Sequence, residues 1–268
     1  MKKIAVILIL LSTNIFAQKT DLLKNNLKGN PRIIEESVEK AIIKTNIIEG
    51  YFQEYYNKTY FNSSGNVEKI ENFDENGELN SIESFKYAND KILEIEKINN
   101  DETLVILKKF EYNELGFKVL LLENEILISE TFYILDQNKN IVEQKEINLI
   151  DESLTTSRNN EFKDNFLVKT VVKYGKDGYI IQYKYGKSDI PSEEIIYDLK
   201  NKLVSKKIRK FDSSNNLVEE NLFDQDGKLK TNNRIQYEYD ENGNWIKRTQ
   251  YANQIETPVT HSKRTIKY

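Results

Sequence analysis

The stretch that decides the fold is Arg234-Ile-Gln-Tyr-Glu-Tyr-Asp-Glu-Asn-Gly-Asn-Trp-Ile-Lys-Arg248. Ahead of its polar centre, apolar and polar residues alternate, which places Ile235, Tyr237 and Tyr239 on one face of a strand. A type I turn followed by a glycine in the left-handed region closes such a hairpin with a one-residue bulge. The stretch therefore predicts a β-hairpin.

If residues 241–243 form the loop of this hairpin, Asp240 opposes Asn244 and Tyr239 opposes Trp245. The aspartate side chain can accept hydrogen bonds from backbone N–H groups inside the turn. Gly243 fits a positive φ that costs another residue about 1 kcal/mol or more. After the turn, simple alternation predicts that Trp245 and Tyr251 share one face of the second strand.

The same phrase recurs along the chain: an aromatic residue, a polar turn ending in Gly or Asn, and then an apolar residue. Clear copies occupy residues 73–79, 223–229 and 239–245, and weaker copies occupy 61–67 and 211–217. Turn signals at intervals of about 12 residues are typical of consecutive antiparallel strands. We predict an all-β fold, an antiparallel meander of hairpin repeats forming a twisted or curled sheet, as a single domain over residues 18–268.

Three segments depart from this pattern. Residues 32–48 have spacing that fits either a first long strand or a short helix, with strand slightly favoured. Residues 151–166 are the most polar interval and predict a long loop. Residues 104–135 contain consecutive apolar positions, and strands of that kind need cover on both faces. A sheet that curls over itself would supply this cover, and so would a docked partner.

The N-terminus has the form of an export signal. Lys2 and Lys3 precede an unbroken apolar run, and Ala17 offers a cleavage site before Gln18. Residues 1–17 therefore predict a signal peptide, and the mature chain is expected in the periplasm, outside the cell or at the cell surface. The apolar run is too short to span a bilayer, and no run of about 18 apolar residues follows it, so we expect no membrane-spanning segment.

A membrane β-barrel is disfavoured by the distribution of charge. Counting back by twos from Tyr268 places Arg264 on a strand face that would have to contact lipid. An arginine there costs about 2–4 kcal/mol at mid-membrane depth. Charged residues also recur on both faces of several strands.

The composition narrows the classes of partner. The chain has 39 Lys and Arg, 43 Asp and Glu, and a formal charge of −4. Removal of Lys2 and Lys3 with the signal takes this charge to −6. A mixed, mildly acidic surface argues against nucleic-acid binding, which needs a concentrated basic face. The chain has no cysteine, so its stability must come from ordinary burial rather than from disulfides.

No catalytic or metal-binding constellation is visible, and we predict a protein that is not an enzyme and has no catalytic residues, metal or cofactor. His261 is the only histidine, and we expect it to be an exposed strand-edge residue. Adjacent acidic pairs such as Glu35-Glu36 point to opposite faces of a strand, which is poor geometry for a shared site. The acidic residue that closes an EF-hand loop is replaced in all three clear copies of the phrase by Phe85, Ile235 and Tyr251.

Aromatic residues are the remaining candidates for a site, with 16 Tyr, 12 Phe and a single Trp in the chain. Exposed aromatic faces can stack on sugar rings, although the same residues could instead form the core face of the sheet. The cluster that we select as a ligand-binding site is Trp245, Tyr237, Tyr239 and Tyr251.

With these motifs in place, the chain resembles YD-repeat (Rhs-like) proteins, in particular the small exported versions of Bacteroidetes-type bacteria, whose C-termini read much like residues 237–248. The resemblance covers residues 59–98 and 205–251 most strongly. It implies a β-repeat architecture, and by analogy it suggests carbohydrate binding. Large Rhs proteins use their repeats as a shell around a toxic domain; this chain has too few repeats for us to expect that it encloses anything.

The leading hypothesis is an exported, non-catalytic β-repeat protein that acts as a binding or scaffold module of the cell envelope. One alternative is a carbohydrate-binding protein that uses an aromatic sheet face. Another is an immunity-type partner of a secreted toxin, suggested by residues 104–135. The partner, a protein or a glycan, and the oligomeric state stay open at this point.

Overall fold

The computed structural model describes residues 20–44, 47–151, 155–253 and 255–268. The signal peptide predicted at residues 1–17 lies outside the described residues. The described elements are α1 (Asp21–Lys24), β1 (Ile33–Lys44), β2 (Ile47–Phe61), β3 (Val67–Phe73), β4 (Leu79–Ala88), β5 (Lys91–Asn99), β6 (Val105–Tyr112), β7 (Gly116–Glu123), β8 (Ile126–Leu135), β9 (Ile141–Asn148), β10 (Thr156–Lys163), β11 (Phe166–Tyr174), β12 (Asp177–Tyr185), β13 (Pro191–Asp198), β14 (Leu203–Phe211), β15 (Leu217–Asp224), β16 (Leu229–Tyr239), β17 (Trp245–Ala252) and β18 (Thr260–Lys267).

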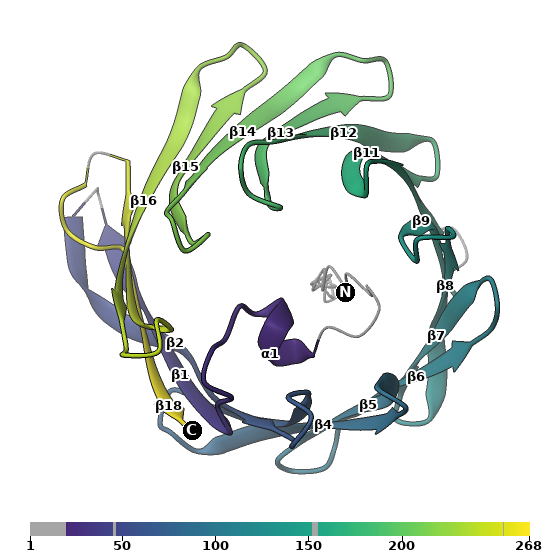
Figure 1. The fold of residues 1–268 in the computed structure, drawn as a ribbon, viewed down its shortest axis with the longest axis horizontal. Helices are drawn as coiled ribbons and strands as arrows, with labels where there is room; N and C mark the ends of the chain where they lie inside the picture. Colours follow the sequence, from purple (N-terminus) through teal and green to yellow (C-terminus); the bar gives the residue numbers. More distant parts are fainter. Residues whose placement is uncertain (1–19, 45–46, 152–154, 254) are drawn as a thin grey trace.

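The strands form one antiparallel sheet that closes into a ring (Figure 1). Each strand pairs with its neighbours in sequence, and β1 pairs with both β2 and β18. The prediction of an all-β antiparallel meander is confirmed. The prediction of an open twisted or curled sheet is wrong, because the first and last strands join and leave a β-barrel.

The turns are built as the sequence predicts. In the last copy of the repeated phrase, the Asp240 carboxylate accepts hydrogen bonds from the N–H groups of Asn242 and Asn244 at 3.0 and 2.8 Å. Gly243 has a φ of 78° and donates its N–H to the Asp240 carbonyl at 3.0 Å. Asp74 and Asp224 accept the equivalent pairs of bonds in their own turns.

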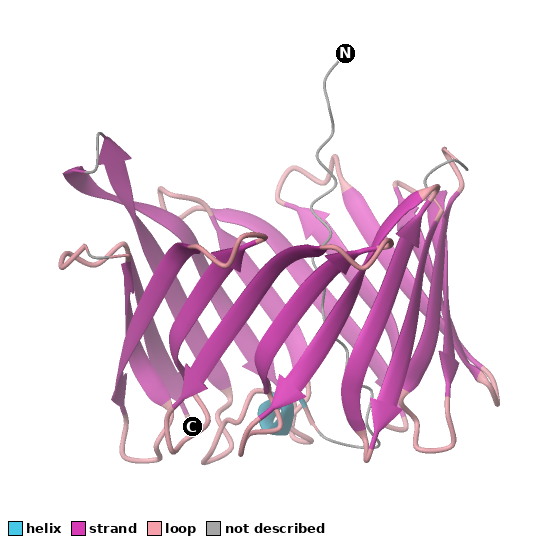
Figure 2. Ribbon diagram, turned by 90° about the horizontal axis from the view of Figure 1, so that it is seen from above, coloured by secondary structure: helices cyan, strands magenta, loops and turns pink. Residues whose placement is uncertain are grey.

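The helix α1 lies within the ring (Figure 1), near one end of the barrel (Figure 2). Its position shows which side chains face the interior. Leu22 of α1 packs against Ile34 and Phe61, with Ile266 beside them. Ile34 and Ile266 are therefore inward, and every second residue along each strand shares that direction, apart from the positions where a bulge shifts the register. This alternation assigns an inner and an outer wall around the whole ring.

The outer wall carries cross-strand ion pairs around much of the circumference. Examples are Lys86–Glu94 at 2.6 Å, Glu111–Lys118 at 3.1 Å and Lys210–Glu219 at 2.8 Å. Opposite charges on neighbouring strands stabilise a sheet by roughly 0.2–1 kcal/mol per pair. The outer wall is therefore a polar surface interrupted by apolar stretches.

The inner wall is not a packed core. Among the described residues, the buried hydrophobic side chains are few: Leu22, Ile34, Val38, Phe61, Phe117, Val172 and Ile235. Most other inward side chains are only partly buried. Barrels of 16–18 strands are wide enough to leave an aqueous interior. The ring thus encloses α1 and leaves most inward side chains partly accessible, contrary to the expectation that so few repeats would enclose nothing.

A recurring tyrosine bond reinforces the end of the barrel that contains α1. At this end the register shifts by one residue in several hairpins, for example between Tyr60 and Phe61 where β2 pairs with β3. An inward tyrosine from the next strand then donates its hydroxyl to a backbone carbonyl at the shift. Four such bonds, at 2.8–3.0 Å, are Tyr87 to Val67, Tyr112 to Ile92, Tyr185 to Leu167 and Tyr237 to Leu217.

Several segments differ from their sequence-based expectations. The described part of 32–48 is strand rather than helix. The predicted loop at 151–166 is wrong, because residues 156–163 form β10. Successive residues of β10 point alternately to the interior and to the outside of the barrel. Neither wall is packed against another layer here, so neither face of β10 needs apolar residues. Residues 104–135 span β6 to β8 of the single-layered wall, and the sheet does not fold back to cover them.

None of the helical segments in the described residues has the length and apolar character needed to cross a membrane.

Replacing Gly243 with Val should destabilise the protein by about 1–2 kcal/mol, because a side chain at positive φ is strained. The added Cβ would also stand 3.2 Å from Lys28 Nζ. Urea unfolding measures this loss, and Glu241→Val, an exposed change in the same turn, serves as the control. Equal stability of the two variants would contradict the role given to this glycine.

Candidate ligand site on the inner wall

Three of the four aromatic residues selected from the sequence meet on the inner wall. The ring centroids of Tyr237 and Trp245 are 6.3 Å apart, and those of Tyr237 and Tyr239 are 6.0 Å apart. Tyr239 opposes Trp245 across the hairpin, as predicted. The Tyr239 side chain is 38% exposed, and the other two are partly buried, so aromatic surface remains accessible from the interior.

Tyr251 lies on the opposite wall, so the prediction that it belongs to this cluster is wrong. The register of β16 and β17 shifts between Glu238 and Tyr239, which makes Ile246 an extra residue. This bulge reverses the alternation, so Trp245 no longer shares a face with Tyr251. Tyr251 instead pairs with Arg234, whose guanidinium carbon lies 5.6 Å from the tyrosine ring centroid on the outer wall.

An arginine–glutamate pair supports the indole ring. The guanidinium carbon of Arg264 lies 3.5 Å from the Trp245 ring centroid, which is a cation–π contact. Arg264 Nε also donates to Glu36 Oε2 at 2.6 Å. The Tyr55 hydroxyl donates to the other oxygen of Glu36 at 2.8 Å. Closure of the ring brings these groups together, because Glu36 lies on β1 and Arg264 on β18.

Arg248 is the polar group of the site with the fewest partners. It pairs with Tyr237 in the register and therefore faces inward. One of its terminal nitrogens donates to Gln250 at 3.3 Å, whereas its buried Nε has no hydrogen-bond partner among the described residues. No ion pair to Arg248 is found within the described part of the chain, unlike Arg209, which contacts both Glu194 and Glu220. Arg248 therefore carries a positive charge that no described carboxylate neutralises, and the remaining N–H groups of its terminal nitrogens can donate to a ligand.

The tyrosine hydroxyls of the site are held in place and stay protonated at neutral pH. Tyr239 donates to Asp212 at 2.8 Å and accepts from the side-chain amide of Asn216 at 2.9 Å. Burial, reinforced by the Asp212 hydrogen bond, raises the pKa of Tyr239 to about 12. Burial also raises the pKa of Tyr237 and, with the charge of Glu36, that of Tyr55.

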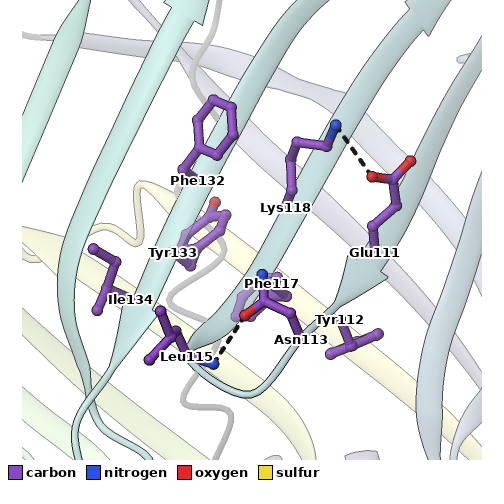
Figure 3. Close-up of a pocket in the computed structure, with 9 residues that line it drawn as sticks. All are labelled: Glu111, Tyr112, Asn113, Leu115, Phe117, Lys118, Phe132, Tyr133 and Ile134. Carbon is purple, nitrogen blue, oxygen red and sulfur yellow. Dashed lines mark hydrogen bonds and ion pairs between the residues drawn. The ribbon is translucent and has the colours of Figure 1, made fainter.

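A second, shallower hollow lies at the β6–β7 turn and reaches β8 (Figure 3). Its volume is about 470 Å³. Phe117 and Tyr133 stack within it with centroids 4.4 Å apart. Leu115, Phe132 and Ile134 are 74%, 38% and 42% exposed. This hollow belongs to the apolar segment 104–135.

Histidine and metal chemistry are not part of either site. His261 is paired on both sides within β18 and is partly buried, with its ring centroid 5.1 Å from that of Tyr51, so the expected exposed strand-edge position is wrong. In the portion of the chain that the structure describes, no three or more His, Cys, Asp or Glu residues form a group that could hold a metal ion.

Sequence reasoning missed the polar half of the inner-wall site, namely Glu36, Tyr55, Arg248 and Arg264. Glu36 and Arg264 are 228 residues apart, and only the unpredicted ring closure joins them. If side chains alternated without interruption after the turn, Arg248 and Trp245 would lie on opposite faces of the strand, and this assumption excluded Arg248 from the predicted site. The signal that could have identified Arg248 is the Asp-x-x-Gly turn itself, because such turns carry a bulge that inverts the following strand.

Chemically, the site combines exposed aromatic ring edges and faces, fixed hydroxyl groups and one guanidinium without an ion-pair partner among the described residues. The rings can stack on a ring-shaped ligand, the terminal nitrogens of Arg248 can donate hydrogen bonds to it, and the tyrosine oxygens, whose protons are already donated to Leu217, Asp212 and Glu36, can only accept.

Comparison with known proteins identifies no family. No family model matches the sequence, and no curated protein is similar to it at a significant level. Among solved structures, the chain is similar to a porin-like protein from Bacteroides uniformis, with 11% identity, a TM-score of 0.49, and coverage of 90% of this chain and 98% of that one.

Toxin-complex structures are also similar. A TcdB2–TccC3 crystal structure matches 83% of this chain with 11% identity and a TM-score of 0.33. The Photorhabdus luminescens Tc holotoxin pore matches 84% with 11% identity and a TM-score of 0.28. This chain spans 15% of the length of each of these toxin chains. These similarities are remote, and the description of the site depends on the geometry above.

The raised pKa of Tyr239 predicts an alkaline transition. A group whose folded pKa lies above its ordinary value of 10.0 contributes stability that is present below pH 10 and is lost as the pH rises through about 12. Unfolding measured between pH 9 and about 12 should show a smaller loss for Tyr239→Phe than for the wild type. Tyr174→Phe, an exposed position, should behave as the wild type. Identical curves for all three proteins would contradict the prediction.

Proposed function

We propose that the protein is an exported, non-enzymatic binding protein of the cell envelope that holds sugar rings against the inner wall of its barrel. The observation that carries this proposal is the inward cluster of Trp245, Tyr237 and Tyr239, which presents aromatic surface to a solvent-filled space. Aromatic residues that are not needed for a packed core are available for stacking on a ligand. The terminal nitrogens of Arg248 then supply directional hydrogen bonds.

The charged residues of the outer wall favour a barrel whose inner and outer walls both contact water. Lys206 lies near the middle of β14 and contacts Glu193 on the neighbouring strand β13 at 2.9 Å. A lysine on a lipid-facing wall costs about 2–4 kcal/mol at the membrane midplane. Ion pairs of this kind recur around the wall, so a position in the periplasm or at the cell surface suits the barrel better than one across a bilayer.

Fluorescence of Trp245, the single tryptophan, provides a direct test. Titration with a panel of oligosaccharides should change the emission of the wild type for at least one sugar. Tyr237→Ala should weaken that binding at least tenfold, equivalent to about 1.4 kcal/mol. Tyr251→Ala, on the opposite wall of the same hairpin, should leave it unchanged.

Tyr237→Phe distinguishes the contribution of the Tyr237 ring to sugar binding from the contribution of its hydroxyl to the stability of the barrel. The change keeps the ring and removes the bond to Leu217, so it should bind as the wild type does even if its stability falls. No response of Trp245 to any sugar, or equal weakening by Tyr237→Ala and Tyr251→Ala, would refute the proposal. Turnover of a bound sugar that Glu36→Gln abolishes would refute the non-enzymatic assignment.

An immunity-type role is a second candidate, favoured by the exposed apolar residues around the β6–β8 hollow. A toxin docked there would cover Leu115, Phe132 and Ile134. Co-purification with a toxin encoded beside this protein should be lost in Phe132→Asp. It should persist in Phe166→Asp, whose position is similarly exposed at 42%. A monomer that retains no such toxin would exclude this role.

A further inference from the structure

The β1–β2 hairpin extends beyond the rest of the ring and forms a two-stranded ribbon (Figure 2). These are the longest strands, with 12 and 15 residues. β18 pairs with β1 only as far as Lys40, and β3 pairs with β2 only from Tyr56 onward. Over residues 47–55, the backbone of β2 is therefore paired on one side alone within the described structure.

Both faces of this ribbon are apolar and exposed. Ile42 and Phe52 face one way and are 41% and 47% exposed; Ile43 and Tyr51 face the other way and are 45% and 38% exposed. Ile47, near the tip, is 66% exposed. A two-stranded hairpin is marginally stable in water without further strands. An unprotected apolar edge is also a ready template for another strand.

The charges on the ribbon are neutralised within it. Lys44 pairs with Glu49 at 2.6 Å, and Lys40 pairs with Glu54. The edge of β2 thus presents no net charge that would repel an identical edge. Unpaired backbone N–H and C=O groups are costly in hydrocarbon, so the free edge suits a strand partner better than a lipid surface.

We propose that residues 47–55 pair with the same segment of a second copy of this chain, joining two barrels through a continuous antiparallel sheet. A two-fold axis makes such an edge complementary to itself. Pairing centred on Tyr51 places Ile47 opposite Tyr55 and Glu49 opposite Gln53. No two carboxylates then face each other, and each tip isoleucine gains an aromatic neighbour.

The test is the mass of the full chain in solution over a range of concentrations, measured by analytical ultracentrifugation. The wild type should shift from monomer to dimer. Ile47→Lys should raise the dissociation constant at least tenfold, because a lysine then replaces the isoleucine opposite Tyr55 at each end of the paired segment, and a lysine at a sheet edge opposes pairing with another strand. Ile126→Lys is the matched control, since Ile126 is 65% exposed at a different hairpin, and it should dimerise as the wild type does.

Cysteine cross-linking tests the geometry, because the chain has no cysteine of its own. Under oxidation, Tyr51→Cys, which faces its own copy in this register, should form a disulfide-linked dimer, whereas Ile126→Cys should not. A mixture of Gly50→Cys and Phe52→Cys, which face each other, should form a mixed disulfide and keeps the test valid if Tyr51→Cys fails to fold; circular dichroism checks each variant.

A wild type that stays monomeric throughout, or an Ile47→Lys variant that dimerises normally, would overturn the proposal. So would a monomer that binds neutral lipid vesicles through this hairpin. Ile47 is not part of the inner-wall site. Loss of dimerisation in Ile47→Lys should therefore leave the response of Trp245 to sugars unchanged, which distinguishes this proposal from the proposed function.

Discussion

Backbone pairing between the first and last strands, from Ile33 with Lys267 to Lys40 with Thr260, is the constraint on which the rest of the structure depends. Every other strand pairing joins neighbours in sequence and needs only a turn. The pairing of β1 with β18 closes the wall of the barrel and confines the open edges of the sheet to the projecting ends of β1 and β2. It also separates an inner wall from an outer one, and it brings Glu36 to Arg264 beneath Trp245.

The local structure could be predicted from the sequence because it rests on short-range chemistry. The turn around Asp240 and Gly243 and the pairing of Tyr239 with Trp245 follow from a few adjacent residues. Closure could not be predicted in the same way. No residue of β1 or β18 marks the other as its partner, and a curled open sheet and a barrel have the same alternation of residues.

The errors at Tyr251 and β10 have two different physical causes. At Tyr251, one bulged residue inverts the strand, and every side chain after it changes walls. At β10, the assumption that a strand needs an apolar face does not hold in a wall with solvent on both sides. Half of the binding cluster was accessible to sequence reasoning because it lies on one hairpin. In the other half, Arg248 lies on the same hairpin but beyond the bulge, and Glu36, Tyr55 and Arg264 come from strands that only closure brings near.

The position of α1 inside the ring has a consequence for how the protein reaches its final state. α1 precedes β1, and β18 is the last described strand, so the ring cannot close around the helix until β18 is present. The hairpins join residues close in sequence and can form quickly, whereas closing a loop of more than 200 residues (Ile33 to Lys267) carries a larger entropic cost and belongs to the slow class of contacts. Enclosing the helix and completing the wall are therefore one late event, and a chain shortened at its C-terminus would keep its hairpins but lose its interior.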